Sequence, residues 1–133
     1  KSLEFQQKMY EICKKIGIDP ISVIHSSATV SSYSNLGKSV IIGPNVIVGP
    51  DTEIGDFSVL LNASTVAHHT KLGKYVTLSD GTHIAGNVTI GDLSYLGIGV
   101  IVNKRINIGK KVVVVSGAIV IDNVADDSIV RLN

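Results

Sequence analysis

An aliphatic residue recurs at every sixth position from Ile24 to Val120, and this period limits the possible folds more than any other feature of the chain. Only the eighteenth position of the series, Asp126, is not aliphatic. The residue four places after each member is always small or β-branched, from Ala28 to Val130. An alternating strand has a period of two and a helix a period of about 3.6. A strict period of six therefore predicts a repeated unit of one short strand and one corner.

Three such units close one triangular coil, and the inward side chains of each coil stack on their counterparts three hexads away. The stacking distance is roughly 4.8 Å, the spacing of hydrogen-bonded strands. Residues 24–131 then make six coils, because no hexad is interrupted by an insertion. Glycine follows the aliphatic position in eight hexads, where we expect the backbone to turn a tight corner. The sequence predicts an all-β solenoid of about six triangular coils.

The first residues of the chain follow a different period. Phe5, Met9, Ile12 and Ile16 are spaced as the apolar stripe of an amphipathic helix. Gly17 is a suitable C-terminal cap, and the Asp-Pro pair that follows favours an extended chain. We therefore divide the chain into an N-terminal helix and linker, residues 1–20, and a β-helix domain, residues 21–133.

Charge and hydropathy exclude two classes of partner. The 12 basic and 11 acidic residues give a net charge of +1, and no basic block could follow a nucleic-acid backbone. No apolar run approaches the roughly 20 residues of a membrane-spanning helix. The lone cysteine, Cys13, cannot form an internal disulfide, and no signal-peptide pattern opens the chain. We expect a cytoplasmic protein that binds neither nucleic acid nor a membrane.

Two adjacent histidines, His68 and His69, occupy outward-facing corner places of the hexad that begins at Val66. One coil later, the same corner carries Gly86 and Asn87. An imidazole beside a glycine N–H suits acyl transfer from a thioester. The imidazole removes the proton of the acceptor, and the N–H binds the oxygen that gains negative charge. Because surface histidines are often merely solvated, an inert corner remains the alternative.

The stretch from Asn62 to Val102 resembles the hexapeptide acetyltransferases of the sialic acid O-acetyltransferase and nucleotide-aminosugar N-acetyltransferase family. The segments that carry the resemblance are VAHHTKLG, LSDGTHIAGNVTIG and YLGIGVIV, and a looser likeness extends from about Tyr10 to Val130. The resemblance implies a left-handed parallel β-helix, although general rules favour right-handed crossovers. It also implies a homotrimer with the active site between adjacent prisms.

The resemblance assigns roles to individual residues of this sequence. In that family the histidine that matches His68 is the general base, and the glycine that matches Gly86 offers its N–H to the acetyl carbonyl of acetyl-CoA. Positions that match Ile98, Ser116 and Gly117 line the groove for the pantetheine arm of this co-substrate. The implied reaction is acetyl transfer to an amino group of a nucleotide-linked deoxyamino sugar in glycan biosynthesis.

The chain departs from the family pattern in three places. The family has an acidic residue after the catalytic histidine, whereas this chain has His69, which we keep as a second candidate catalytic residue. Asp80 and Asp92 are candidates to replace that carboxylate across a subunit interface. Residues 1–20 resemble only the last helix of a sugar-binding α/β domain. Because the chain also stops before the family's short tail, we expect a shortened chain.

Three other functions remain open. Sugar O-acetylation would use the same base and the same N–H donor. A β-helix carbonic anhydrase would need three histidines around zinc, but neither His25 nor His83 stacks on His68, so we expect no metal site. A structural prism with a degenerate site is the non-enzymatic alternative.

Overall fold

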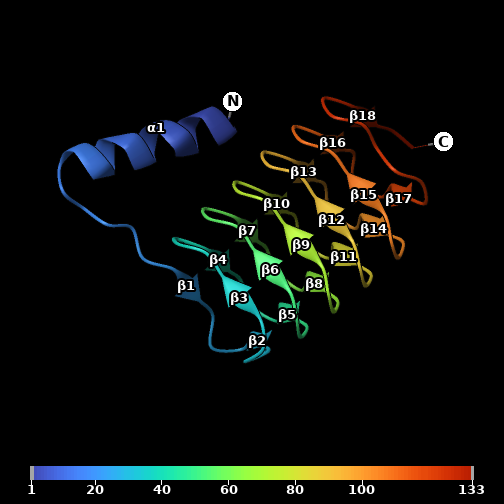
Figure 1. Ribbon diagram of the computed structural model, residues 1–133, viewed down its shortest axis with the longest axis horizontal. Helices are drawn as coiled ribbons and strands as arrows, with labels where there is room; N and C mark the ends of the chain where they lie inside the picture. Colours follow the sequence, from blue (N-terminus) through green and yellow to red (C-terminus); the bar gives the residue numbers. More distant parts are fainter. Residues whose placement is uncertain (1, 133) are drawn as a thin grey trace.

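The computed structural model describes residues 2–132, in which one helix precedes a parallel β-helix of about six coils (Figure 1). Helix α1 spans Ser2–Lys15, and every strand after it has two residues. The strands are β1 (Val23–Ile24), β2 (Thr29–Val30), β3 (Asn35–Leu36), β4 (Ile41–Ile42), β5 (Ile47–Val48), β6 (Glu53–Ile54), β7 (Val59–Leu60), β8 (Thr65–Val66), β9 (Lys71–Leu72), β10 (Thr77–Leu78), β11 (His83–Ile84), β12 (Thr89–Ile90), β13 (Tyr95–Leu96), β14 (Ile101–Val102), β15 (Asn107–Ile108), β16 (Val113–Val114), β17 (Ile119–Val120) and β18 (Ile129–Val130). The predicted left-handed parallel β-helix with a short N-terminal helix is confirmed.

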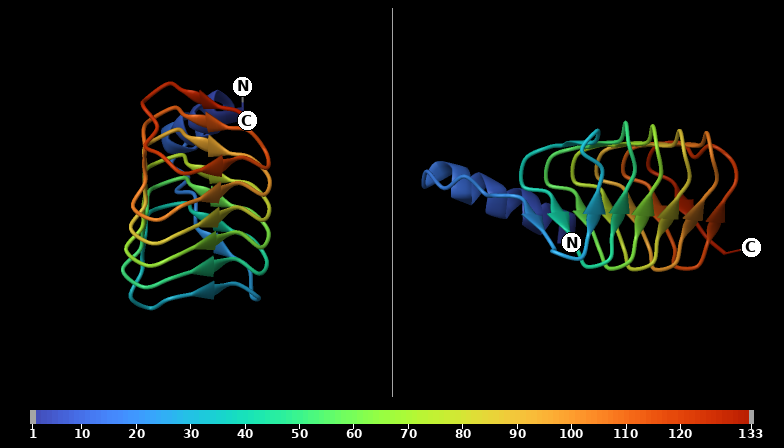
Figure 2. Two further views of the ribbon diagram at one scale, coloured as in Figure 1. Left: turned by 90° about the vertical axis from the view of Figure 1, so that its right-hand side faces the viewer. Right: turned by 90° about the horizontal axis from the view of Figure 1, so that it is seen from below.

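The strands form three parallel sheets, and the coils stack along one axis (Figure 2). Sheet A contains β1, β4, β7, β10, β13, β16 and β18; sheet B contains β2, β5, β8, β11, β14 and β17; sheet C contains β3, β6, β9, β12 and β15. The register places Thr77 opposite Tyr95 and His83 opposite Ile101, a separation of three hexads in each pair. The predicted coil of three hexads is therefore confirmed.

The core is a single column of small and branched side chains inside the three sheets. The aliphatic places of the hexads are buried from Ile42 to Val120, and most of the places four residues later are buried as well. Ile24 in the first coil is exposed, because no coil lies beneath it. Each coil therefore depends on its neighbours for a dry interior, as expected of a solenoid.

The sequence prediction is wrong in the last coil, which is two residues shorter than the others. Strand β16 pairs with β18 in a register that places Val114 opposite Val130, two places short of three full hexads. Val124 therefore takes the aliphatic place that the six-residue count gives to Asp126, because it bridges Ile108 in the coil before it. Asp126 lies on a corner instead, where its Oδ1 accepts a hydrogen bond from the Lys110 N–H at 2.8 Å. The one exception in the aliphatic series is thus explained by a shortened bend.

The predicted role of the glycines is also wrong. From residue 39 to residue 117, every sixth residue is in the left-handed region, and it is usually not glycine, as with Asn45 (φ 58) and Ala63 (φ 56). The glycines that follow the aliphatic places do not have positive φ. A Cβ on Gly55 would lie 2.4 Å from the carbonyl carbon of Gly73. These glycines are needed because adjacent coils approach too closely for a side chain.

Buried hydroxyl groups connect each coil to the next. Ser58 donates to the Gly73 carbonyl at 2.9 Å and accepts from the Val76 N–H at 3.1 Å. Thr70 and Ser94 make the same pair of bonds in their own corners. Polar groups inside the prism are therefore paired, as buried polar groups must be.

Helix α1 ends as the sequence predicts, but its apolar stripe is largely uncovered. Gly17 has φ 76, and the Ile18 N–H donates to the Cys13 carbonyl at 2.8 Å, which are features of a glycine cap. Phe5 and Ile16 are 64% and 63% exposed. Within residues 2–132, no helix combines the length and the apolar character needed to cross a membrane.

Three aromatic rings attach α1 to the prism. The ring centroids of Tyr10 and Phe57 are 4.2 Å apart, and those of Phe57 and Tyr75 are 4.9 Å apart. Burial, followed by the neighbouring Tyr10, Glu11 and Asp56, raises the pKa of Tyr75 above its ordinary value of 10.0. The helix is therefore held by an aromatic stack on the corner between sheets C and A.

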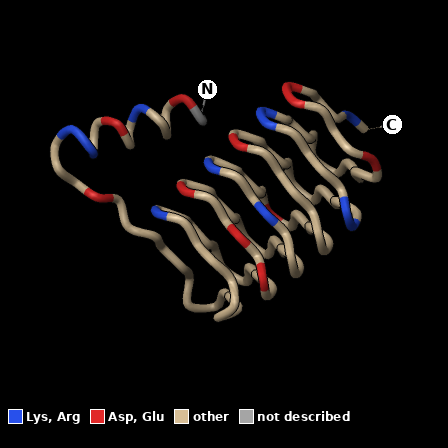
Figure 3. Tube along the Cα trace, viewed as in Figure 1, with Lys and Arg blue, Asp and Glu red and all other residues tan. Residues whose placement is uncertain are grey.

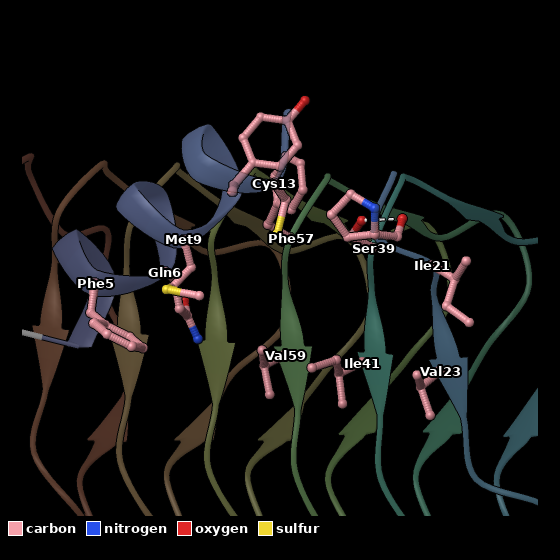
Figure 4. A pocket seen from close by; sticks show the side chains of 12 residues that line it. Phe5, Gln6, Met9, Cys13, Ile21, Val23, Ser39, Ile41, Phe57 and Val59 are labelled. Atoms are coloured by element: carbon pink, nitrogen blue, oxygen red, sulfur yellow. Dashed lines mark hydrogen bonds between the residues drawn. The ribbon is translucent and has the colours of Figure 1, made fainter. Parts of the chain in front are cut away.

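An apolar groove separates α1 from the outer face of sheet A (Figure 4). Phe5, Met9 and Cys13 line its helix side, and Ile41 and Val59 line its sheet side. Its volume is about 270 Å³. The helix thus covers only part of the apolar outer face of sheet A.

The corner between sheets C and A carries basic and acidic residues in alternate coils (Figure 3). Asp56 accepts a hydrogen bond from the Lys38 N–H at 2.9 Å, and Asp92 accepts one from the Lys74 N–H at 2.9 Å. The Lys74 Nζ also lies 3.7 Å from Asp56 Oδ2. These carboxylates therefore cap the backbone of their own corner.

Candidate active site

The histidine pair lies in the bend that joins β8 to β9, between sheets B and C. We call residues 49–52, 67–70, 85–88 and 103–106 the B–C corner. His69 takes the left-handed conformation with φ 57, and both imidazoles are exposed. The structure thus places His68 and His69 on an outward corner, as the period predicts.

The imidazole of His68 covers Gly86 in the next coil. A Cβ on Gly86 would lie 2.8 Å from Nε2 and 2.7 Å from Cε1 of His68. The Asn87 N–H donates to the His68 carbonyl at 3.0 Å, which holds the two coils in register. The structure therefore brings together the two residues that the stacking of hexads pairs.

The N–H of Gly86 has no acceptor within the part of the chain that the structure describes. At four equivalent places, a side chain one coil further on caps the N–H: Asp56 caps Lys38, Asp92 caps Lys74, Asp126 caps Lys110 and Ser116 caps Ile98. One coil beyond Gly86, this place holds Lys104, whose ammonium group carries only donors. The Gly86 N–H therefore remains available to an acceptor from a ligand.

Thr70 fixes the turn that contains Gly86. Its buried hydroxyl donates to the Ala85 carbonyl at 3.0 Å and accepts from the Val88 N–H at 3.3 Å, so the two bonds bracket the glycine. Sequence reasoning placed Thr70 among the small inward residues and missed this role. The available signal was a hydroxyl at an inward place in the coil before Gly86.

His69 connects His68 to a carboxylate of the preceding coil. The Nδ1 atoms of His68 and His69 are 3.0 Å apart, and His69 Nε2 is 3.6 Å from Asp51 Oδ2. Sequence reasoning considered Asp80 and Asp92 for this role and missed Asp51. Because Asp51 occupies the same place as His69 in the preceding coil, the stacking rule itself points to it.

The three residues predicted for the pantetheine groove lie on another corner, between sheets A and B. Ser116 Oγ accepts a hydrogen bond from the Ile98 N–H at 3.1 Å, and the Gly117 N–H donates to the Ile98 carbonyl at 2.8 Å. The side chain of Ile98 is 58% exposed. A small hollow beside Gly117 is bordered by Ile119, Arg131 and Leu132. We call residues 97–100 and 115–118 the A–B corner.

The two corners lie on opposite edges of sheet B within one chain. The outer face of this sheet carries three exposed isoleucines, Ile47, Ile101 and Ile119 (50%, 43% and 62% exposed), among the polar residues Thr29, Thr65 and His83. The outward residues of sheet C are instead polar: Asn35, Glu53, Lys71, Thr89 and Asn107. Each chain thus carries two separate sets of candidate residues, with exposed isoleucines of sheet B between them.

The other two histidines lie away from His68. His83 is in β11, and its Nδ1 is 2.8 Å from Thr65 Oγ1 on the outer face of sheet B. The Nδ1 of His25 is 2.8 Å from Ser27 Oγ in the first coil. Within residues 2–132, no three side chains of His, Cys, Asp or Glu converge in a way that could hold a metal ion.

No family model and no curated protein sequence matches the chain, but solved structures match it closely. A histidine-to-alanine variant of the GDP-perosamine N-acetyltransferase of Caulobacter crescentus, solved with CoA and GDP-perosamine, is 28% identical, with a TM-score of 0.92 over 95% of this chain. The acetyltransferase domain of PglB from Neisseria gonorrhoeae, also solved with acetyl coenzyme A, is 25% identical, with a TM-score of 0.92 over 96% of this chain. WeeI from Acinetobacter baumannii is 26% identical, with a TM-score of 0.93 over 97% of this chain.

The chain spans 60%, 62% and 64% of these three proteins. Two of them are named as acetyltransferases in complexes with CoA or acetyl coenzyme A. The predicted resemblance to the hexapeptide acetyltransferases is therefore confirmed at the level of structure.

Proposed function

We propose that the chain is the catalytic β-helix of an acetyl-CoA-dependent acetyltransferase that acts on an amino group of a nucleotide-linked deoxyamino sugar. The observation that carries the proposal is the imidazole of His68 beside the Gly86 N–H, which has no acceptor in the described part of the chain. The likeness to an N-acetyltransferase solved with CoA and GDP-perosamine supports both the donor and the class of acceptor.

In this proposal, His68 is the general base. The acceptor nitrogen forms a bond to the carbonyl carbon of acetyl-CoA, and Nε2 of His68 takes the proton that this nitrogen loses. Such a base contributes about 10²- to 10⁴-fold to the rate. When the carbon–sulfur bond breaks, the CoA sulfur takes the proton back from His68. The products are an amide and CoA with a free thiol, so the reaction balances without a covalent enzyme intermediate.

Gly86 stabilises the negative charge that develops during this transfer. As the new carbon–nitrogen bond forms, the carbonyl oxygen becomes negative, and the Gly86 N–H donates a hydrogen bond to it. A fixed donor of this kind lowers the barrier because it needs no reorganisation during the reaction, and its removal costs about 10²- to 10³-fold in kcat.

The A–B corner would supply the groove for the CoA arm. Ile98 offers an exposed apolar side chain to the pantetheine chain. Ser116 and Gly117 lie at the same corner in the next coil. Because this corner is at the opposite edge of sheet B from His68, one chain does not complete the site.

We therefore propose a homotrimer in which sheet B faces the threefold axis. In a ring of three prisms, this arrangement sets the B–C corner of each chain against the A–B corner of the next. The base and the CoA groove then meet at each interface. The exposed isoleucines of sheet B, Ile47, Ile101 and Ile119, would be buried in the centre of the ring.

Transfer to a sugar hydroxyl is the second candidate function, because a hydroxyl nucleophile would use the same base and the same N–H donor. A scaffold without catalysis is the third. We also propose that the protein works in the cytoplasm. Its single cysteine, Cys13, is free and forms no internal disulfide, which fits a reducing compartment.

The test is release of free CoA thiol from acetyl-CoA in the presence of nucleotide-linked amino sugars, with matched hydroxyl sugars in parallel. We expect release with the amino sugars and a kcat about 10²- to 10⁴-fold lower in His68→Ala. His25→Ala, in the first coil, is the control and should retain activity. Release only with hydroxyl sugars would favour the O-acetyltransferase, and full activity in His68→Ala would contradict the proposed base.

A further inference from the structure

We infer that Asp51 and His69 form a relay that keeps a proton on Nδ1 of His68 and leaves Nε2 unprotonated beside Gly86. His69 and Asp51 would be positioning residues, which act on the reaction only through His68. The catalytic consequence rests on the proposed acetyl transfer, whereas the position of the proton can be measured without any reaction.

The relay begins at the contact between the two imidazoles. The Nδ1 atoms of His68 and His69 are 3.0 Å apart, which is a hydrogen-bond distance. Two neutral imidazole nitrogens can share such a bond only if one carries the proton and the other accepts it. Only two arrangements of protons therefore fit this contact.

Asp51 distinguishes the two arrangements. An ionised carboxylate only accepts hydrogen bonds, and Asp51 Oδ2 lies 3.6 Å from Nε2 of His69. At this distance the charge of Asp51 favours a proton on that nitrogen, directly or through a bridging water. Nδ1 of His69 is then the acceptor, and Nδ1 of His68 is the donor. The opposite arrangement would direct a lone pair of His69 at the carboxylate.

The relay ends at Nε2 of His68, the atom that accepts the proton in the proposed reaction. The Nε2 and Cε1 edge of His68 is the part of the ring nearest to Gly86, because a Cβ there would be 2.8 Å and 2.7 Å from these atoms but 3.3 Å from Cδ2. With its proton on Nδ1, His68 presents the Nε2 lone pair at this edge. The proton acceptor thus lies against the residue whose N–H has no acceptor in the described part of the chain.

Backbone hydrogen bonds fix the orientation of both histidines. The His69 N–H donates to the Pro50 carbonyl at 3.1 Å, and the Asn87 N–H donates to the His68 carbonyl at 3.0 Å. His69 (φ 57) and Asp51 (φ 54) have the same left-handed conformation at the same place of adjacent coils. Within residues 2–132, Asp51 is the only carboxylate in ion-pair range of either histidine.

The direct test is nuclear magnetic resonance of the unligated chain labelled with ¹⁵N in histidine. Only four histidines give signals, and His25→Asn and His83→Asn assign two of them by difference. At a pH of about 8.5, where an ordinary histidine is neutral, we expect His68 to carry its proton on Nδ1 and His69 on Nε2. Free imidazole side chains exchange between both forms, so a single form at each residue is diagnostic.

Two variants separate the relay from general effects on structure. Asp51→Ala should leave both histidines with mixed tautomers and the fold intact, because exposed charge contacts contribute little to stability and alanine already has the left-handed conformation at Ala63. Glu53→Ala is the matched control, since its carboxylate makes a contact of the same 3.6 Å, but with Lys71, and it should leave the histidine signals unchanged. A proton on Nε2 of His68, or unchanged tautomers in Asp51→Ala, would overturn the inference.

A kinetic test separates positioning from catalysis. Asp51→Ala should lower kcat roughly 10-fold without changing the KM for acetyl-CoA, since it acts only on the orientation of the base. In His69→Asp, a carboxylate oxygen replaces Nδ1 at the same number of bonds from the backbone, and aspartate tolerates the left-handed conformation. The loss caused by Asp51→Ala should therefore shrink in the His69→Asp background. An equal loss in both backgrounds would contradict the relay, and a chain without any transferase activity would refute the proposed function but not the tautomer result.

Discussion

The Nε2 edge of the His68 imidazole lies over Gly86 so closely that a Cβ on residue 86 would be 2.8 Å from that nitrogen. Gly86 does not have positive φ, so the backbone at this place would accept other residues. The contact with His68, and not the turn, therefore explains why glycine stands here. This relationship joins the base and the N–H donor of the proposed reaction.

Gly86→Ala should lower kcat about 100-fold, because the new methyl group displaces the imidazole from its position over the corner. The melting temperature should change little, since the exposed His68 side chain can turn into solvent. Gly43→Ala is the control, because its Cβ would meet its neighbour, Asn62 Oδ1, at a milder 3.1 Å and on another corner. Steady-state kinetics of both variants would check this prediction, and full activity in Gly86→Ala would refute it.

Thr70→Val should lower both stability and activity. The substitution removes the hydroxyl that pairs the Ala85 carbonyl with the Val88 N–H, which should cost about 1–3 kcal/mol in the free energy of unfolding. Ser94→Ala removes the same pair of bonds from a distant corner and should cost a similar amount. Denaturant unfolding measures both costs.

Kinetics then separate the two hydroxyl variants. Only Thr70→Val should lower kcat, because only Thr70 fixes the turn that contains Gly86. An equal loss of kcat in Ser94→Ala would show that general destabilisation, and not the position of Gly86, causes the effect.

Ile101→Asp should convert the trimer into monomers, because it places a charge among the exposed isoleucines of sheet B that the proposed interface buries. Sedimentation equilibrium should give three times the 14.0 kDa mass of one chain for the unaltered protein. For the variant it should give the mass of one chain. Thr89→Asp, on the polar outer face of sheet C, should remain trimeric. A monomeric unaltered chain that still transfers acetyl groups would contradict the shared site.

Tyr75 should make the fold sensitive to alkaline pH. Because burial raises the pKa of Tyr75 in the folded chain, its neutral form contributes stability that is complete below about pH 10 and is lost as the pH rises through the folded value. Tyr75→Phe keeps the ring stacked on Phe57 but removes the hydroxyl that titrates, and with it this pH dependence of stability. Melting temperatures from pH 8 to 11 should therefore fall less steeply in Tyr75→Phe, and parallel curves for the two proteins would refute the prediction.

The period of six was sufficient to predict the coils, because each inward place must pack against its counterpart one coil away. The same rule placed His68 beside Gly86 from the sequence alone. It failed at Asp126, since a bend that is two residues shorter changes the phase of the pattern without leaving a mark such as an inserted loop. The missing aliphatic residue at that place was the only signal of the change.

The candidate site was predicted less completely than the fold. The stacking rule identifies which residues are neighbours, but not which of their atoms meet. Asp51 was missed because its distance to His69 depends on the rotamers of two exposed side chains. Thr70 was missed because an inward threonine or serine looks the same in the sequence in both cases. Its hydroxyl can only fill space, or it can hold the turn that contains Gly86. The meeting of the two corners depends on subunit packing, which the period of one chain does not contain.

The measurement that tests the central claim most directly is calorimetric titration of the purified chain with acetyl-CoA, which needs no sugar acceptor. We expect one binding site per chain and loss of binding in Ile98→Asp, which places a carboxylate in the proposed groove of the A–B corner. Ile18→Asp, at a similarly exposed isoleucine near α1, should bind normally. Absence of binding by the folded, trimeric chain, or undiminished binding by Ile98→Asp, would contradict the proposal that this chain carries the groove for acetyl-CoA.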